Sequence, residues 1–209
     1  MRQPDESAKH QDYISFGRYV ARRCRRGGFD ELAALAASAT DDVKAAGRAW
    51  EDAAEGVQEF MADRDMADDV LDGVVRRCRR QLLARSVSVE KQGWFKAIFH
   101  SGVGYYIAAP LDKEKARYGE FVALLRDNLE EGDELLEQVP GEVEQGLSAF
   151  GEAVEAMGQA EQGRLLARSR LERAKDNWRR TMERLFGALT EHFSSRSEAD
   201  RFFPRGRRG

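Results

Sequence analysis

The sequence of 209 residues has few of the residues that interrupt helices or build chemical sites. Its four prolines leave room for long uninterrupted helices, because each proline removes a backbone donor and disfavours helix at its predecessor. The two cysteines, Cys24 and Cys78, are too few for a disulfide framework or a metal site of their own. The three histidines are isolated, and no HExxH, Glu-x-x-His pair or Cys-x-x-Cys motif occurs. We therefore expect no metal, no cofactor and no catalytic residue.

A long hydrophobic run is also missing. The longest stretch without Lys, Arg, Asp or Glu covers residues 97–111, whereas a membrane-spanning helix needs about 20 apolar residues. The first residues are polar and lack the apolar core of a secretory signal. Both features favour a cytoplasmic protein and leave association with a membrane surface open.

What the chain does contain is typical of helices. Hydrophobic residues make up 42% and charged residues 34%, and Ala, Leu, Glu and Arg are abundant. These side chains lose little conformational entropy in a helix, and apolar residues recur at spacings of three and four over long stretches. The net charge of -3 gives no global field of the kind that marks nucleic-acid binders. The sequence predicts an all-α fold, an elongated antiparallel helical bundle with coiled-coil character.

The order of patterns along the chain predicts one continuous structural domain with five segments. Glycines 27–28 should interrupt or kink the first helical segment, Thr40 should cap a long helix, and Pro140 should end or kink a later helix. The expected segments are a flexible arm (1–10), a first helical hairpin (11–90), an aromatic connector (91–110), a second helical hairpin (111–195) and an extended basic tail (196–209).

The two hairpins look like copies of one plan. When the second half is moved back by about 100 positions, similar residues coincide along both long helices. Matching pairs include Val43 with Val143, Trp50 with Phe150, Arg64 with Arg164, Leu71 with Leu171, and Arg79-Arg80 with Arg179-Arg180. An internal duplication and the convergence of two amphipathic helices on one pattern both explain this agreement.

Charge is arranged in blocks along both long helices. Residues 41–72 hold eleven acidic and three basic side chains, and residues 73–98 hold seven basic and one acidic. The second half repeats this order, with an acidic block at 111–163 and a basic block at 164–184. Antiparallel neighbours would place opposite charges together. If the two long helices are parallel within one chain, an antiparallel homodimer supplies that arrangement, so we expect the partner to be a protein and most simply a second copy.

The pentapeptide Arg-Arg-Cys-Arg-Arg occurs twice, at residues 22–26 and 76–80. Its arginines point around a helix and are candidates for binding phosphates or acidic groups. These candidates are Arg22, Arg23, Arg25, Arg26, Arg76, Arg77, Arg79 and Arg80. The cationic surroundings would favour the thiolate form of Cys24 and Cys78, and so oxidation or acylation. The alternative interpretation is structural, with the arginines paired to the acidic blocks.

The connector at 91–110 combines aromatic and basic residues in the way that interfacial segments do. Its candidate residues for docking to a membrane or a partner are Trp94, Phe95, Lys96, Phe99, Tyr105 and Tyr106. The same aromatic side chains could instead close the end of the bundle as part of its core. Burial of Trp94, Phe99 and Tyr106 would indicate the second role.

These features favour a non-enzymatic helical scaffold or adaptor that mediates protein–protein assembly. A first alternative is a peripheral membrane protein, because a basic amphipathic N-terminal helix followed by long helices with a proline kink resembles the architecture of BAR domains. This resemblance implies a dimer that binds anionic membranes. A second alternative is nucleic-acid binding through the arginine clusters, with strong salt dependence.

Overall fold

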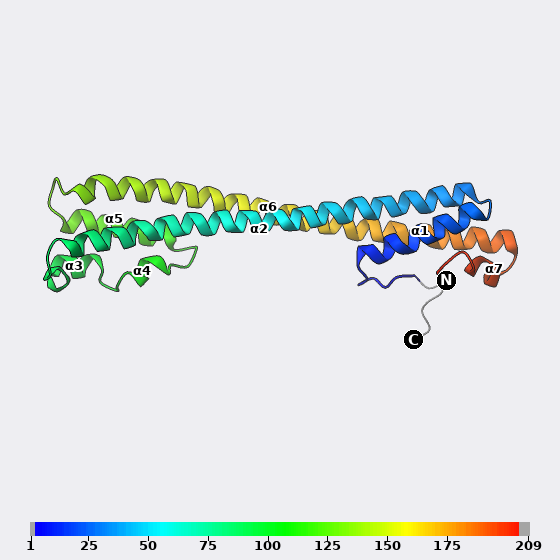
Figure 1. Cartoon of the computed structure of the whole chain (residues 1–209), viewed down its shortest axis with the longest axis horizontal. Coiled ribbons are helices and arrows are strands. Elements are labelled where there is room, and N and C mark those ends of the chain that lie inside the picture. Colours follow the sequence, from blue (N-terminus) through cyan, green and yellow to red (C-terminus); the bar gives the residue numbers. More distant parts are fainter. Residues whose placement is uncertain (1–2, 205–209) are drawn as a thin grey trace. The chain divides into compact units, whose positions relative to one another are not determined.

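The computed structural model describes residues 3–204, and every regular element in that range is a helix. The prediction of an all-α helical bundle is confirmed (Figure 1). Two long helices, α2 (Asp30–Ala84) and α6 (Glu134–Phe193), contain 55 and 60 residues. The remaining elements are α1 (His10–Arg26), the 3-10 helix η1 (Val89–Lys91), α3 (Gly93–Ile98), α4 (Gly104–Ile107), α5 (Glu114–Asn128) and α7 (Arg196–Asp200).

The chain forms two compact units, and each unit takes residues from both halves of the sequence. Unit 1 contains residues 1–57 and 160–209, and unit 2 contains residues 58–159. Each has its own core: Tyr13, Val20 and Trp178 are buried in unit 1, and Leu71, Phe121 and Leu125 in unit 2. The units therefore do not coincide with the hairpins at 11–90 and 111–195 that follow chain order.

Neither Thr40 nor Pro140 marks the end of a helix. Thr40 does not cap a helix: it lies inside α2, where its hydroxyl donates to the carbonyl oxygen of Ala36 at 2.6 Å. A threonine hydroxyl can satisfy the preceding turn in this way, so a capping residue type does not by itself start a helix. Pro140 also lies inside a helix, near the start of α6. The interruption at residues 27–28 is real, since α1 ends at Arg26 and Gly28 has a φ of +80°.

Within each unit, α2 and α6 run antiparallel. In unit 2, Arg77 forms an ion pair with Glu142, and Arg85 forms one with Asp133 at 2.5 Å, so later residues of α2 meet earlier residues of α6. In unit 1, the indole nitrogen of Trp178 donates to the hydroxyl oxygen of Thr40 at 3.2 Å. The basic end of α2 thus meets acidic residues of the same chain. The parallel arrangement on which the argument for an antiparallel homodimer depended is not present.

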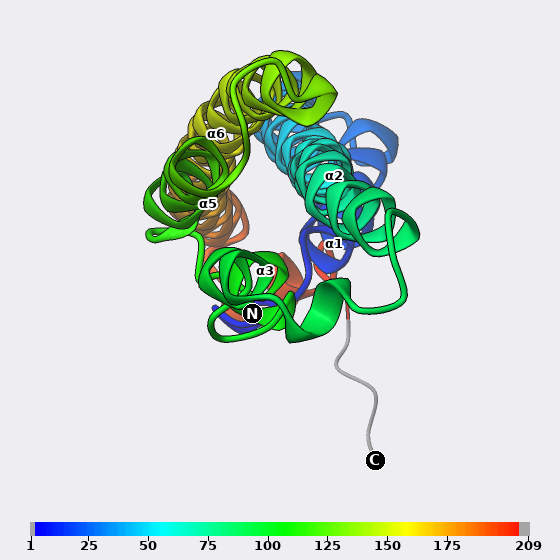
Figure 2. The same cartoon turned by 90° about the vertical axis from the view of Figure 1, so that its left-hand side faces the viewer.

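The connector folds back onto unit 2 instead of linking two separate hairpins. Figure 2 shows α3 beside α5, and the Phe99 ring, directly after α3, lies 6.0 Å from the Phe121 ring of α5. Tyr106 of α4 also packs on Phe121, with 5.1 Å between ring centroids. The connector thus brings the chain back along α2 before α5 begins at Glu114.

Both ends of the described chain pack against unit 1. The Tyr13 hydroxyl donates to the carbonyl oxygen of Asp5, and Arg179 binds the carbonyl oxygen of Pro4 and the carboxylate of Glu6. Residues 4–6 are therefore held in place rather than forming a free arm.

The tail was predicted to be extended from residue 196, but it begins with α7. Phe203 is 1% exposed and its ring contacts Phe16 and Phe186, which explains why this segment folds back. Residues 1–2 of the arm and 205–209 of the tail lie outside the described range.

Candidate functional site

Helix α1 has one buried apolar face and one face rich in arginine. Its buried side chains include Tyr13, Val20 and Cys24, which recur at spacings of seven and four. Arg18, Arg22, Arg25 and Arg26 are exposed, and residues four, seven and eight positions apart share one side of a helix. The apolar spacing that folds α1 onto unit 1 thus turns these four arginines to the outside.

A close contact at Gly17 sets the position of α1 on α2. A Cβ atom at this glycine would lie 2.0 Å from Oγ1 of Thr40 and 2.9 Å from Nε1 of Trp178. Any larger residue would push α1 away, because Cβ atoms do not approach other atoms so closely. Gly17 therefore brings the arginine-bearing helix close to α2.

The arginine face borders an open groove between α1 and α2, with a volume of about 480 Å³. The groove is lined by Arg18, Ala21, Arg22, Arg25, Arg26, Ala37, Thr40 and Asp41. A smaller hollow of about 180 Å³ shares Arg18 and adds Lys44 and Arg48 of α2. We call the surface formed by Arg18, Arg22, Arg25, Arg26, Lys44 and Arg48 the arginine groove.

None of these six cations forms an ion pair or a side-chain hydrogen bond within residues 3–204. Of the two acids that border the hollows, Glu51 faces His10 at 3.4 Å, so Asp41 is the one left to balance the arginines. Guanidinium groups bind carboxylates and phosphates through paired hydrogen bonds. This surface can therefore take up an anionic group without first breaking an internal ion pair.

Arg23 differs from its neighbours in the same pentapeptide. Its Nε donates to the carbonyl oxygen of Arg201 at 3.2 Å, and its guanidinium lies 5.9 Å from the centroid of the Phe202 ring. It holds the C-terminal segment of unit 1 and is not part of the arginine groove. Three of the four predicted arginines of residues 22–26 are thus brought together in the groove.

The second pentapeptide lies on α2 in unit 2, where three of its four arginines have acidic partners. Arg76 contacts Asp72 at 2.8 Å, Arg77 pairs with Glu142, and Arg79 contacts Glu90 at 3.1 Å. Arg80 makes no ion pair with any residue of the described range. The structural interpretation therefore fits residues 76–79, which stabilise unit 2.

The two cysteines are not thiolate sites. Cys24 and Cys78 are both 0% exposed and free. Burial raises the pKa of the Cys24 thiol to about 11 and that of Cys78 to about 12. Desolvation of the thiolate outweighs the attraction of the adjacent arginines, whose guanidinium groups point away from the core. The expectation of reactive cysteines is corrected accordingly.

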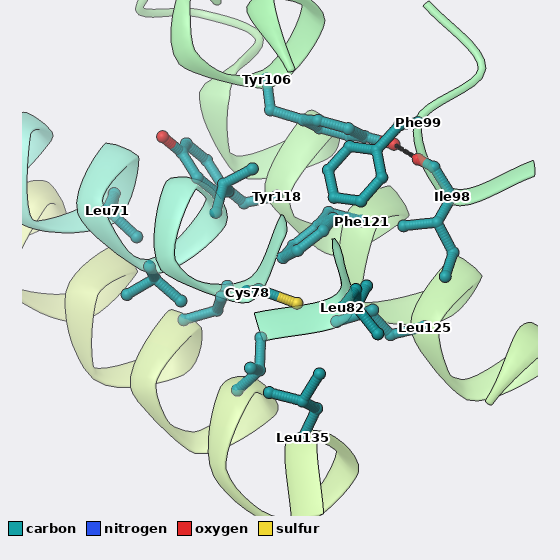
Figure 3. Packing of buried hydrophobic residues seen from close by; sticks show 14 of the residues in the cluster. Leu71, Cys78, Leu82, Ile98, Phe99, Tyr106, Tyr118, Phe121, Leu125 and Leu135 are labelled. Atoms are coloured by element: carbon teal, nitrogen blue, oxygen red, sulfur yellow. Dashed lines mark hydrogen bonds between the residues drawn. The ribbon is translucent and has the colours of Figure 1, made fainter. Parts of the chain in front are cut away.

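The aromatic connector is largely part of the core of unit 2. Phe95, Phe99 and Tyr106 are buried, and the Tyr106 hydroxyl donates to the carbonyl oxygen of Ile98 at 2.6 Å (Figure 3). Large side chains with satisfied polar groups are typical of a packed core. Burial of three side chains was expected if the connector closes the end of the bundle, and two of them, Phe99 and Tyr106, are buried.

The other candidate docking residues of the connector are more accessible. Trp94 and Tyr105 are half-buried, and Lys96 is exposed. The Tyr105 hydroxyl donates to Glu120 at 2.8 Å, and the Arg117 guanidinium lies 4.4 Å from the centroid of its ring. The structure therefore leaves Trp94 and Lys96 as accessible side chains without bringing the six candidates together on one surface.

A buried carboxyl cluster in unit 2 was not predicted from the sequence. Asp72 accepts hydrogen bonds from the Tyr118 hydroxyl at 2.9 Å and from Arg76, while the Oε2 atom of the buried Glu114 has no hydrogen-bond partner. Burial and the charges of Asp68 and Asp72 raise the pKa of Glu114 to about 7. Within residues 3–204, no group of His, Cys, Asp or Glu side chains is arranged to hold a metal ion.

Arg18, Lys44 and Arg48 are the members of the arginine groove that are not among the candidates chosen from the sequence. Lys44 and Arg48 lie on α2 and join Arg18 because α1 and α2 form a hairpin. The interruption at residues 27–28, and not the expected helix start at Thr40, is the turn of this hairpin. In the described part of the chain, no helix is long and apolar enough to cross a bilayer.

Comparisons of the chain with family models, with curated proteins and with solved structures found no match. The function is therefore inferred from the geometry and charge of the site.

Proposed function

We propose that this protein is a non-enzymatic helical adaptor that binds an acidic segment of a protein partner in the arginine groove. The observation that carries the proposal is the set of cations on α1 and α2 that have no ion-pair partner in the described chain. Like charges held along one hairpin repel one another, and an acidic ligand relieves that repulsion. The groove is open to solvent, as a surface that binds a chain segment must be.

A protein ligand suits this groove better than a membrane surface. A membrane-binding helix of this kind inserts an apolar face, but the apolar face of α1 is already buried in unit 1. Phe95, Phe99 and Tyr106 are likewise packed inside unit 2 and offer no wedge. The arginine groove itself would attract anionic lipids through charge alone.

The lining of the groove also suits a protein better than single-stranded nucleic acid. Its cations are joined by Ala21, Ala37 and Thr40, and its lining contains no Phe, Tyr or Trp side chain. Proteins that bind single strands combine cations with aromatic platforms for the bases. Carboxylates need only the guanidinium groups, so an acidic peptide uses what the groove provides.

Fluorescence anisotropy with a labelled peptide of ten glutamates tests the proposal. The wild-type chain should bind it at about 50 mM salt, and binding should weaken as salt increases, because surface charges are screened. The variant R22E/R25E should bind at least about tenfold more weakly, a loss of about 1.4 kcal/mol. The matched control R180E/R184E makes the same change of charge on exposed arginines of α6 and should bind as the wild type does.

The competing ligands are tested with the same variants. Phosphatidylserine vesicles and a DNA duplex replace the peptide, with circular dichroism to verify that each variant is folded. Absence of peptide binding together with groove-dependent binding to vesicles or DNA would refute the acidic protein segment and identify the anion source instead.

A further inference from the structure

A second surface of the chain lacks a partner and has the opposite charge. Within unit 2, Glu59, Asp63, Met66 and Val70 follow one another on α2 at spacings of four, three and four, so they form a single stripe. Met66 is 63% exposed and Val70 is 56% exposed. Neither acid of the stripe forms an ion pair or a side-chain hydrogen bond with residues 3–204. We call these four residues the acidic ridge.

The acidic ridge is similar to the arginine groove in length and opposite to it in charge. At about 1.5 Å per residue, the ridge from Glu59 to Val70 extends about 16 Å, and the groove from Arg18 to Arg26 extends about 12 Å along α1. Glu59 and Asp63 are one helical turn apart, as are Arg18 and Arg22. An antiparallel or parallel approach of the two helices can therefore place each carboxylate beside a guanidinium.

The two surfaces also match in side-chain size. The groove has small side chains between its arginines, namely Ala21, Ala37 and Thr40. The ridge carries two larger apolar side chains, Met66 and Val70, which project from α2 into solvent. Helices pack when the ridge of one enters the groove formed by others, and small residues on the floor allow close approach. Burial of two exposed apolar side chains adds a favourable term that purely electrostatic binding lacks.

We propose that the arginine groove of one copy of this chain binds the acidic ridge of a second copy. This inference rests on the proposed function and identifies the acidic partner as the chain itself. The contact joins two different surfaces, so it is heterologous and needs no antiparallel pairing of whole molecules. It differs from the antiparallel homodimer expected from the sequence, because it joins an unpaired groove of one copy to an unpaired ridge of another.

The contact should be weak and sensitive to salt. One helix in one groove buries less surface than a stable dimer interface, and its ion pairs are exposed. We expect a dissociation constant of about 10 µM at low ionic strength. Sedimentation velocity on the full chain, from about 5 to about 300 µM, should show an average mass that rises with concentration at about 50 mM salt and falls again at about 500 mM.

Two charge-reversed variants test which surfaces are in contact. R22E/R25E makes the groove acidic while the ridge stays acidic, and E59K/D63K makes the ridge basic while the groove stays basic. Each variant should be monomeric alone, because its two surfaces repel. An equimolar mixture should associate again, since the groove of each variant then meets a ridge of opposite charge. The control R180E/R184E should associate like the wild type.

The outcomes separate this inference from the proposed function. A wild-type chain that stays monomeric at about 300 µM and about 50 mM salt overturns self-association, whereas the glutamate peptide still reports on the groove. Self-association that survives R22E/R25E, or a mixture that stays monomeric, overturns the assignment of groove and ridge. If the wild-type chain neither binds the peptide nor self-associates, both proposals are refuted. Restored association in the mixture supports the inference, because a misfolded variant could not regain it.

Discussion

The same pentapeptide, Arg-Arg-Cys-Arg-Arg, occurs in both units and has a different environment in each. In unit 2 it lies on α2, where α6 offers Glu142 and η1 offers Glu90 to its arginines. In unit 1 it lies at the end of α1, and Arg22, Arg25 and Arg26 line a groove to which α2 contributes Ala37, Thr40 and Asp41. Both cysteines are buried in the same way. The sequence of the pentapeptide determines which face of its helix is buried. The neighbouring helices determine whether its arginines have acidic partners.

The units also differ in which charged groups they bury. Unit 1 buries Lys175, whose ammonium contacts Glu172 at 3.1 Å and lies over the Tyr13 ring. Unit 2 buries Asp72 and Glu114, and Glu114 lacks a hydrogen-bond partner at one oxygen. A buried carboxyl group without partners favours its neutral form. The stability of unit 2 should therefore respond to pH near neutrality through a group that has no counterpart in unit 1.

The largest expected effect separates the units by packing. Gly17→Ala places a Cβ atom against Thr40 and Trp178 in unit 1 and should lower the free energy of unfolding by about 2 kcal/mol. Gly119→Ala in α5 of unit 2 is the matched control, because nothing lies within 4 Å of its Cβ position. That variant should gain up to about 1 kcal/mol, since alanine favours helix over glycine. Urea denaturation measures both, and equal effects would contradict the close contact at Gly17.

A smaller effect should grow as the pH rises and be complete only above neutral pH. Glu114 has an ordinary pKa of 4.5, and in the folded chain its pKa is raised to about 7, chiefly by burial. The folded state keeps the proton longer than the unfolded state, so this group destabilises the fold increasingly as pH rises from about 4.5 to about 7. Glu114→Gln should therefore be more stable than wild type by about 1–2 kcal/mol at about pH 8.5 and about equal to it at about pH 4.5.

Urea denaturation at these two pH values checks the prediction for Glu114. Glu144→Gln removes an exposed carboxyl group of α6 and serves as the control, with no difference expected between the two pH values. A Glu114→Gln variant whose stability follows wild type across the whole pH range would show that the carboxyl group is solvated.

The smallest effect tests the two pentapeptides directly. R77A/R79A removes two ion pairs of unit 2 and should lower the free energy of unfolding by about 1 kcal/mol. R22A/R25A removes two unpaired cations of unit 1 and should change it by less than about 0.5 kcal/mol. Thermal or urea unfolding at low salt distinguishes them. A larger loss for R22A/R25A would mean that the groove arginines have structural partners after all.

Local patterns predicted much of the fold. Apolar residues at helical spacing predicted long helices, and the glycines at 27–28 marked the end of α1. The long amphipathic runs predicted α2 and α6, because an apolar stripe at helical spacing has to be buried. The same reasoning failed at Thr40, whose hydroxyl can cap a helix or bond within one, and at Pro140, which α6 accommodates near its start.

The candidate site could not be predicted from local sequence patterns alone. The arginines of residues 22–26 were recognised from their sequence alone, but Lys44 and Arg48 joined them only through the α1–α2 hairpin. The buried carboxyl cluster combines Asp72 of α2 with Glu114 of α5, which are far apart in the chain. In the sequence, Asp72 and Glu114 look like the exposed acidic residues around them. The local pattern therefore gives no sign that these two carboxyl groups are buried.

The sequence by itself determined the class of this protein, its helical faces and the placement of both arginine clusters on helices. Helix propensity and apolar spacing act over a few residues, and they suffice for those features. The tertiary structure decided which arginines are paired, which aromatic side chains are buried, and that α2 and α6 run antiparallel in each unit. Those properties depend on contacts between residues such as Thr40 and Trp178, whose proximity is set by the packing of whole helices and not by the pattern of either one.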